Sequence, residues 1–513
     1  MGDFGILSLL PPLLAIVLAF ITKNVLLSLF CGVLVGATML AGGNIILGFV
    51  DTVGEYLIPQ MGDSWNASVI LMTLFVGVFS ALLERGGGAQ AFGRAMEKRI
   101  RTRKQAQTAT WLGGLMVFFS DSSNSVLLGP IFKPITDRVK VSREKLAYIC
   151  DSTASSIPLL LPITAWGAYI MGILRNELPE GTNLFSVLAQ SAPYNIYTIA
   201  AIVMVLMIAI TGFDFGPMKR AEDRAKKEGK VLADGASPLK KELSKELPTN
   251  AKPTIWDMIV PLLSLIITLF VVFLWTGGFP EVGFVEALSN ADTMLGLSVA
   301  FFVGAIVASI FTRKSRVLKG KEIFSTWTDG FSQMIEAILI LVLSWCIGAV
   351  TSDVGTAAYI VEITQGLITP GVMFVVIFAA AAVTGFSTGT SWGTFAIFLP
   401  IAVPLAIAND ISIYPAIGAA LAGGLFGDHC SPISDSTVLA SLGASSDHLD
   451  HVKTQLPYAI SAAIASVVGY MIVAATNNVW LGLISTLVIL FGIVFIANKV
   501  SIKTASAGKN ISG

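Results

Sequence analysis

The chain has 513 residues, no formal net charge and a mean hydropathy of +0.77, and 54% of its residues are hydrophobic. Only 13% are charged, against roughly 25% in soluble domains. A water-soluble fold could not bury this much apolar sequence, and the balanced charge gives no indication of a nucleic-acid partner.

Apolar runs recur from one end of the chain to the other. Examples are 9–20, 69–83, 196–210, 258–274 and 479–497. With their flanks, most approach the roughly 20 residues that a helix needs to cross a bilayer. The sequence therefore predicts an all-α polytopic protein of the lipid bilayer, with about 11 to 13 spans or half-spans.

Three short strings recur at nearly one offset, which indicates an internal duplication. VGA (35–37), GAQAF (88–92) and IFKPI (131–135) return as VGA (303–305), GTAAY (355–359) and IFLPI (397–401), at shifts of 268, 267 and 266 residues. We divide the chain into transmembrane repeat 1 (1–213), a charged cytoplasmic linker (214–254), transmembrane repeat 2 (255–476) and a terminal span with a cytoplasmic tail (477–513).

The basic residues predict that the two repeats have opposite orientations. Segment 94–104 has six Lys or Arg and 138–145 has four, whereas 322–452 has none and contains ten acids. Because cytoplasmic loops are enriched in Lys and Arg, equivalent loops of the repeats lie on opposite sides of the membrane. We expect inverted-topology repeats, with the N-terminus outside and the C-terminus inside.

The first polar break of repeat 1 is SDSSNS (120–125). It lies between two basic loops, so 105–136 is either a re-entrant hairpin or two short spans with the break at the tip. The candidate cation ligands there are Asp121 and Asn124, and the candidate substrate or proton contacts are Ser122 and Ser123. The alternative role for Asp121 and Asn124 is an N-cap of the following helix.

The second polar break of repeat 1 is DSTASSIP (151–158). Secondary transporters built from inverted repeats bind their substrates where helices are interrupted near the midplane. Asp151 is therefore a candidate cation ligand, and Ser152 and Thr153 are candidate substrate or proton contacts.

Repeat 2 has two breaks of the same kind, STGTSWGT (387–394) and GDHCSPISDST (427–437). Carboxylates at membrane depth cost several kcal/mol and mark ion or proton pathways, and hydroxyl and carboxylate oxygens suit a small hard cation. The candidate cation ligands are Thr390, Ser391, Asp428 and Asp435, and the candidate substrate or proton contacts are Thr388, His429, Ser431 and Ser434. The alternatives are helix caps for the acids and a packed histidine bonded to a carbonyl for His429.

Other titratable groups near these segments have weaker claims. His448 and His451 fall in SSDHLDHVK (445–453), where a metal site is conceivable but a solvated cytoplasmic loop is the preferred interpretation. Lys133 either balances an aspartate or extends to the membrane surface. Glu84 and Glu336 each end or interrupt an apolar run. In the linker, a short helix near 219–230 is expected, with its mixed charges in solvent.

The string GDHCSPISDST resembles the NhaC family of bacterial Na⁺/H⁺ antiporters. The resemblance continues through FSTGTSWGT (386–394), SLGASSDHLDHVKTQLPYA (441–459) and the N-terminal LLPPLLAIVLAFITKNVLLSLFCGVLVG, and covers nearly the whole chain. It implies a secondary transporter of the bacterial cytoplasmic membrane, with a hairpin-bearing transport domain, an elevator motion and a homodimer. The resemblance does not fix the substrate, because it extends to malate/lactate exchangers and amino-acid carriers.

The leading hypothesis is Na⁺/H⁺ antiport, in which Na⁺ and H⁺ compete for carboxylates centred on Asp428, Asp435 and Asp151, without a cofactor. The alternative is a Na⁺- or H⁺-coupled carrier of a small organic solute, with Trp392 or Trp166 lining its pocket. A channel is disfavoured because paired breaks in inverted repeats suit alternating access. An enzyme is disfavoured because no G-x-S-x-G or H-E-x-x-H pattern accompanies the acids.

Overall fold

The computed structural model describes residues 4–509 except 23, 98, 119–120, 239–247, 249, 357–358 and 360–368. Ser120 lies outside the described residues, and so do the side chains of Ser122 and Ser123, so the predictions for those two stay untested. Throughout the described chain the regular structure is helical, apart from one isolated β-bridge between Pro238 and Asp447.

The elements before the linker are η1 (Gly5–Leu9), α1 (Leu10–Thr22), α2 (Val25–Leu40), α3 (Ile45–Asp51), η2 (Thr52–Leu57), α4 (Ile58–Gly62), α5 (Ser64–Arg85), α6 (Gly88–Glu97), α7 (Arg103–Met116), α8 (Asp121–Arg138), α9 (Arg143–Ala154), α10 (Ser156–Leu160), α11 (Ala165–Leu174), α12 (Leu184–Ser191), η3 (Ala192–Tyr194) and α13 (Ile196–Thr211). Those that follow are α14 (Gly216–Glu228), α15 (Trp256–Thr276), α16 (Phe284–Asn290), α17 (Thr293–Lys314), α18 (Gly320–Gln333), α19 (Ile335–Asp353), α21 (Pro370–Thr388), α22 (Ser391–Ala408), α23 (Ile413–Cys430), α24 (Asp435–Ala444), α25 (His448–Thr476) and α26 (Val479–Lys509).

Nine helices in the described residues are long and apolar enough to cross a membrane. Two further pairs reach that length only together, because each is bent at a break: Val25–Leu40 with Ile45–Gly62 by 116°, and Arg143–Leu160 with Ala165–Leu174 by 47°. Counting both pairs gives 11 spans. The prediction of an all-α polytopic membrane protein is confirmed.

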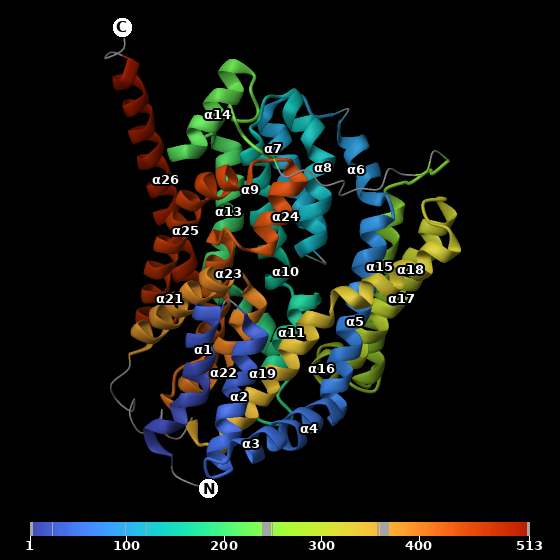
Figure 1. Ribbon diagram of the computed structural model, residues 1–513. Coiled ribbons are helices and arrows are strands. Elements are labelled where there is room, and N and C mark those ends of the chain that lie inside the picture. Colours follow the sequence, from blue (N-terminus) through green and yellow to red (C-terminus); the bar gives the residue numbers. More distant parts are fainter. Residues whose placement is uncertain are drawn as a thin grey trace.

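The same order of elements occurs before and after the linker. The paired helices α1 and α2 correspond to α15 and α17, the hairpin α7–α8 to α21–α22, the broken α9–α11 to α23–α24, and the long α13 to α25. Figure 1 shows α7–α8 near one end of the molecule and α21–α22 toward the other. This arrangement agrees with inverted repeats, while the domain boundaries and the orientation in the membrane stay predictions.

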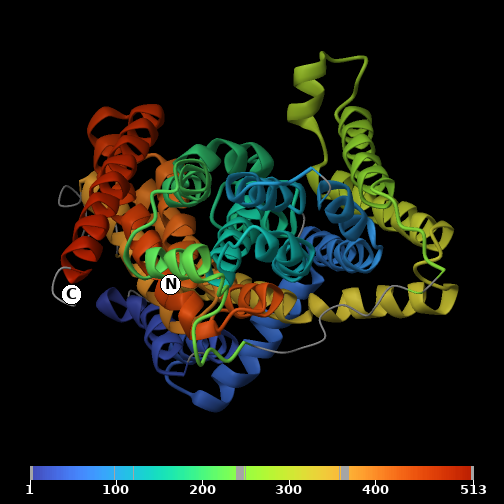
Figure 2. The ribbon, with the colours of Figure 1, turned by 90° about the horizontal axis from the view of Figure 1, so that it is seen from above.

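Helices α5, α15, α17 and α18 pack together on one side of the molecule. Figure 2 shows this group on the side away from α25 and α26, with the hairpins and broken helices between the two groups. The polar breaks therefore lie in the interior of the helical assembly.

Hairpin α21–α22 turns at Gly389, whose φ of +68° is in the left-handed region that glycine adopts without a steric cost. A Cβ atom at this position would lie 2.7 Å from the carbonyl oxygen of Ile433. Gly389 is thus required for two reasons: the turn needs a positive φ, and the hairpin tip approaches the break between α23 and α24 too closely for a side chain.

The linker does form the expected helix, α14, but the prediction that its charges are solvated is wrong for Asp214, Glu222 and Arg224. Asp214 pairs with the buried Lys145 of α9, and Arg224 pairs with the buried Glu144 at 2.8 Å. Glu222 accepts from the backbone N–H of Ser142 at 2.8 Å. The start of α9 supplies a partner for each of these three residues, so the first part of the linker docks on the helical assembly.

Candidate functional site

The two polar breaks of repeat 2 meet at Asp428, in the last turn of α23. The Ser391 hydroxyl, at the start of α22, donates to Asp428 Oδ2 at 2.6 Å, and its backbone N–H lies 3.3 Å from the same oxygen. Ser391 is fully buried and Asp428 is 6% exposed. The structure therefore joins two predicted ligands from different breaks of repeat 2.

Asp151 lies on the facing helix α9 and is fully buried. Its Oδ2 accepts from the Thr437 hydroxyl at 2.9 Å and from the Gln455 amide at 2.7 Å. Thr437 belongs to α24 and Gln455 to α25, so repeat 2 supplies both donors. The prediction that the site combines residues of both repeats agrees with this contact.

His429 connects these two carboxylate environments. Its Nε2 lies 3.0 Å from the Ser152 hydroxyl and its Nδ1 lies 2.8 Å from the Tyr197 hydroxyl. Its backbone carbonyl accepts from the Gln455 amide at 2.6 Å. Both ring nitrogens face hydroxyls, which can donate or accept, so either neutral tautomer fits this environment.

Three buried oxygens of the predicted ligands have no hydrogen-bond partner among the described residues: Asp428 Oδ1, Asp151 Oδ1 and Asn124 Oδ1. A buried polar atom without a partner costs roughly 1–3 kcal/mol, and more when it is charged. A carboxylate or amide oxygen can be satisfied only by a donor or a cation. These atoms are therefore the chemical features of the site that fit a bound cation, and the two carboxylates also fit a proton.

The other predicted residues have partners of their own. Asn124 donates to the backbone carbonyls of Gly114 and Val117 at 2.8 and 3.1 Å, which ties the start of α8 to the end of α7. Asp121 accepts from the Trp166 indole at 3.2 Å. Thr153 and Thr388 bond to carbonyls of their own helices. Lys133 donates to the Ser445 hydroxyl at 3.1 Å.

Within the second break of repeat 2, three residues shape the backbone. The Ser431 hydroxyl donates to the Phe386 carbonyl at 2.8 Å, and Ser434 is the N-cap of α24. Thr390 precedes α22 as its N-cap residue, without a side-chain capping bond. Asp435 is exposed, as is Glu336, so the structure does not bring Asp435 into the buried cluster around Asp428.

The break predicted at DSTASSIP is displaced along the chain. Asp151, Ser152 and Thr153 are helical in α9, and the 47° bend lies between Leu160 and Ala165. Leu161 is extended, with φ −111° and ψ 117°, because the residue before a proline, here Pro162, avoids the helical region. Asp151 therefore faces the site from a regular helix.

The placement of His451 in a solvated loop is wrong. His451 lies in the first turn of α25 and is fully buried. It bonds to Ser441 and Gln455, and its Nε2 is 3.9 Å from Asp151 Oδ2. Its burial follows from the short break 445–447, which ends α24 and starts α25 against α9.

Sequence reasoning also missed Gln455, Thr437 and Tyr197, which contact the predicted residues directly. Gln455 is a lone amide four residues after His451, on the same face of a helix, and that spacing was the available signal. No group of three His, Cys, Asp or Glu in the described part of the chain has a metal-binding arrangement. A cation would therefore be held by carboxylate oxygens together with hydroxyl, amide or backbone oxygens.

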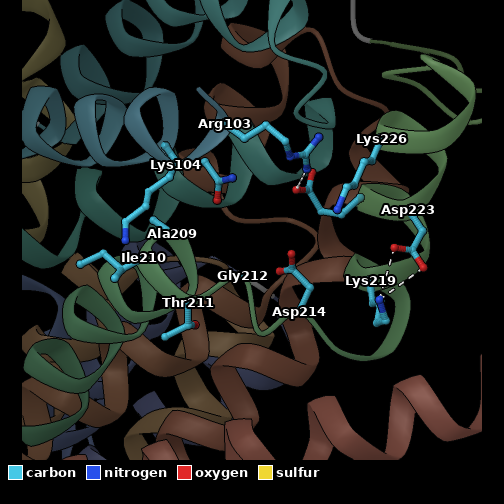
Figure 3. Close-up of a pocket in the computed structure, with 12 residues that line it drawn as sticks. Arg103, Lys104, Ala209, Ile210, Thr211, Gly212, Asp214, Lys219, Asp223 and Lys226 are labelled. Carbon is cyan, nitrogen blue, oxygen red and sulfur yellow. Dashed lines mark hydrogen bonds and ion pairs between the residues drawn. The ribbon is translucent and has the colours of Figure 1, made fainter. Parts of the chain in front are cut away.

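A cavity of about 290 Å³ lies elsewhere, where α7, α13 and α14 meet. Figure 3 shows Arg103 and Lys104 on one side of it and Lys219, Asp223 and Lys226 on α14. None of the predicted site residues lines it, so this cavity is separate from the buried carboxylates.

The family model described as the Na⁺/H⁺ antiporter family matches residues 158–475 of this chain, more than half of its length. The chain belongs to the Na⁺/H⁺ antiporter family. It is 35% identical over 512 residues to an uncharacterized protein of Haemophilus influenzae, covering 96% of this chain and 95% of that protein. The match confirms the family suggested by GDHCSPISDST, and the chain is a multi-pass membrane protein of a secondary transporter family.

Two named relatives match shorter parts of this chain. It is 30% identical over 182 residues to the malate-2H⁺/Na⁺-lactate antiporter of Bacillus subtilis, covering 34% of this chain and 39% of that one. It is 27% identical over 181 residues to the Na⁺/H⁺ antiporter NhaC of Alkalihalophilus pseudofirmus, and the match covers 35% of this chain and 38% of that protein. The fold is similar to that of the YdaH transporter of Alcanivorax borkumensis, with a TM-score of 0.58, 14% identity and coverage of 86% and 89%.

Proposed function

We propose that the protein exchanges Na⁺ for H⁺ across the membrane, with Na⁺ and H⁺ competing for the carboxylates of Asp428 and Asp151. The observation that carries the proposal is the pair of buried carboxylate oxygens, Asp428 Oδ1 and Asp151 Oδ1, that lack a hydrogen-bond partner in the described structure. An ionised, unpaired carboxylate is costly inside a protein of low polarity. A proton or a cation removes that cost, so the occupied states are favoured over the empty one.

Competition for one site couples the two flows. If Na⁺ must leave before a proton binds, and the loaded forms cross between the two sides more readily than the empty one, each turnover exchanges one ion species for the other. The Ser391 hydroxyl supplies a neutral oxygen beside Asp428, and neutral oxygens with one or two carboxylates are ligands that hard cations accept.

We test the proposal by following ΔpH with a fluorescent dye in everted vesicles after addition of Na⁺. The wild-type protein is expected to move protons in response to Na⁺, and Asp428→Asn is expected to abolish the response. Asp435→Asn is the matched control, because Asp435 lies seven residues further along and is exposed. Full Na⁺-dependent proton movement by Asp428→Asn would overturn the assignment.

A second function is favoured by one observation. The rings of Trp166 and Trp392 pack together with centroids 5.2 Å apart. The Tyr169 hydroxyl donates to the Trp392 carbonyl at 2.7 Å, and the Trp166 indole N–H donates to the Asp121 carboxylate. Aromatic walls beside polar groups are typical of small-molecule sites, and the B. subtilis relative is named for malate and lactate. The test is Na⁺ uptake into proteoliposomes. Uptake that requires malate, lactate or an amino acid would show that the protein is a coupled carrier of an organic solute and not a simple Na⁺/H⁺ exchanger.

We further propose that the protein resides in the bacterial inner membrane with its N-terminus outside, that it works as a homodimer, and that it uses no cofactor. The basic segments 94–104 and 138–145 support the orientation, since both would then face the cytoplasm. The family resemblance supports the homodimer. Cysteine labelling from either side, and mass measurement in detergent, test the two proposals.

A further inference from the structure

The cavity of about 290 Å³ between α7, α13 and α14 is separate from the predicted ion site, yet charged side chains line it. Four of its lining residues are Lys or Arg and three are Asp or Glu. Figure 3 shows Lys104 on the side of α7 and Lys226 on the side of α14. What the cavity can bind depends on which of these charges are already neutralised within the protein.

The three acids of the lining are each paired with a cation. The pairs are Asp214 with Lys145, Glu222 with Arg103, and Asp223 with Lys219. The ammonium groups of Lys104 and Lys226, in contrast, form no ion pair or hydrogen bond in the described part of the chain. These two lysines, from different helices, are therefore the positive charges that the cavity offers to a ligand.

Gln107 adds a neutral donor beside the lysines. It follows Lys104 by three residues on α7, so the two side chains share one face of that helix. Gln107 lines the cavity and is only 6% exposed, and its side-chain amide has no hydrogen-bond partner among the described residues. Buried amides are normally hydrogen-bonded. This one therefore favours a ligand that carries hydrogen-bond acceptors.

The remaining wall of the cavity is apolar and lies where a membrane helix ends. The apolar helix α13 ends at Thr211, and Ala209 and Ile210 in its last turn line the cavity. Ile210 is 45% exposed. The cavity thus lies at the level where α13 leaves the bilayer, and basic pockets at this level between membrane helices suit the headgroups of phospholipids.

We propose that this cavity binds a phosphate group, either in the headgroup of a phospholipid or as free phosphate from the solution. Phosphate oxygens accept hydrogen bonds from ammonium and amide groups alike. Lys104 and Gln107 hold the phosphate from α7, and Lys226 holds it from α14. A bound phosphate thereby ties the linker helix to the first helix of hairpin α7–α8. The inference does not depend on which ion the protein transports.

The test is the melting temperature of the purified full-length protein in detergent, titrated with phosphatidylglycerol. A ligand that binds only the folded protein raises its melting temperature, and the titration gives the half-saturating concentration. Diacylglycerol with the same acyl chains is the control without phosphate. Inorganic phosphate, compared with chloride at equal ionic strength, is the separate arm for a ligand from the solution.

The variants separate this cavity from general surface charge. Gln107→Leu leaves the net charge unchanged and is expected to raise the half-saturating concentration about tenfold, because it removes a donor to a charged group. Lys104→Gln and Lys226→Gln should each raise it about fivefold. Arg101→Gln and Lys227→Gln are the matched controls, because both residues are exposed and neither lines the cavity.

Each outcome decides for or against the site. Saturable stabilisation by phosphatidylglycerol that inorganic phosphate does not reproduce assigns the site to a lipid, and saturable stabilisation by inorganic phosphate assigns it to a free anion. Both results support the proposal when the cavity variants weaken binding and the matched controls do not. Equal effects of the two sets of variants, equal stabilisation by diacylglycerol, or no stabilisation by either phosphate compound would overturn it.

Discussion

The Ser391 hydroxyl donates to Asp428 Oδ2 across 2.6 Å and thereby ties the tip of hairpin α21–α22 to the last turn of α23. The two residues are 37 positions apart in the sequence, and both belong to polar breaks. Because the second carboxylate oxygen of Asp428 is unpartnered, this contact positions the carboxylate without satisfying it. The bond therefore holds the Asp428 carboxylate in place while its other oxygen, Oδ1, stays available to bind a cation or a proton.

Ser391→Ala removes this support and is expected to weaken the apparent affinity for Na⁺ about tenfold or more, since a hydrogen bond to a charged group contributes about 1.5–3 kcal/mol. The measurement is the Na⁺ concentration that gives half-maximal proton movement in vesicles. Thr394→Ala is the control, because the Thr394 hydroxyl bonds to the Thr390 carbonyl of its own helix. Equal affinities in the wild type and Ser391→Ala would show that the bond has no role in ion binding.

Gly427 allows α23 to approach α21 next to this contact. A Cβ atom there would lie 2.1 Å from the Ala382 carbonyl oxygen and 2.6 Å from the Phe386 nitrogen, both backbone atoms. Gly427→Ala must therefore separate the two helices, at a cost of about 1–3 kcal/mol, and move Asp428 from Ser391. We expect a lower melting temperature and weaker Na⁺ affinity together. Gly54→Ala, where no atom lies within 4 Å, is the control and should change neither.

The sequence predicted the architecture well because the signals are local. The length of the apolar runs predicts helices, and the repeated strings IFKPI and IFLPI lie in α8 and α22, the second helices of equivalent hairpins. The breaks led us to predict Asp428, Ser391 and Asp151 as ligands, since a carboxylate in apolar sequence has few structural reasons to be there. The structure buries all three, and their role in ion binding stays a prediction. The exposed position of Asp435 could not be predicted, because the exposure of a helical residue depends on which neighbours pack against it and periodicity alone does not show that.

Gln455, His451 and Lys145 could not be found in the same way. Each lies in a polar stretch that also suits a solvated loop, and each acquires its role only when α25 and α14 pack on α9. Segment 214–231 has the mixed charged composition of a solvated linker, but Asp214 and Glu222 contact residues of α9 and its N-cap that lie more than 60 positions away in the chain. Pairing over such distances has no signature in one sequence.

Gln455→Leu is expected to impair both stability and ion binding. The change removes a donor to Asp151 and leaves His451 Nε2 without its acceptor, at a cost of about 1–3 kcal/mol for each unsatisfied group. We expect a lower melting temperature and a shifted pH profile of proton movement. Ser466→Ala, on the same helix, is the control because its hydroxyl bonds only within α25. A pH profile identical to that of the wild type would confine Gln455 to a structural role.

The ion pair between Lys145 and Asp214 makes a prediction about stability. Lys145 is 1% exposed and Asp214 is 8% exposed, and Tyr458 also donates to Asp214 at 2.7 Å. Removing one partner of a buried pair leaves an uncompensated charge, at about 3–5 kcal/mol. Lys145→Met and Asp214→Asn should therefore each lower the melting temperature markedly.

The double variant decides whether the loss comes from the unpaired charge. With both charges removed, no buried ion remains uncompensated, and the double variant is expected to be more stable than either single variant. Lys227→Met is the control, because Lys227 pairs with Asp223 at 3.4 Å on the exposed face of α14, where a pair is worth under about 1 kcal/mol. If the losses in the double variant simply add, the two residues stabilise the docked linker independently and the ion pair is not what holds α14 to α9.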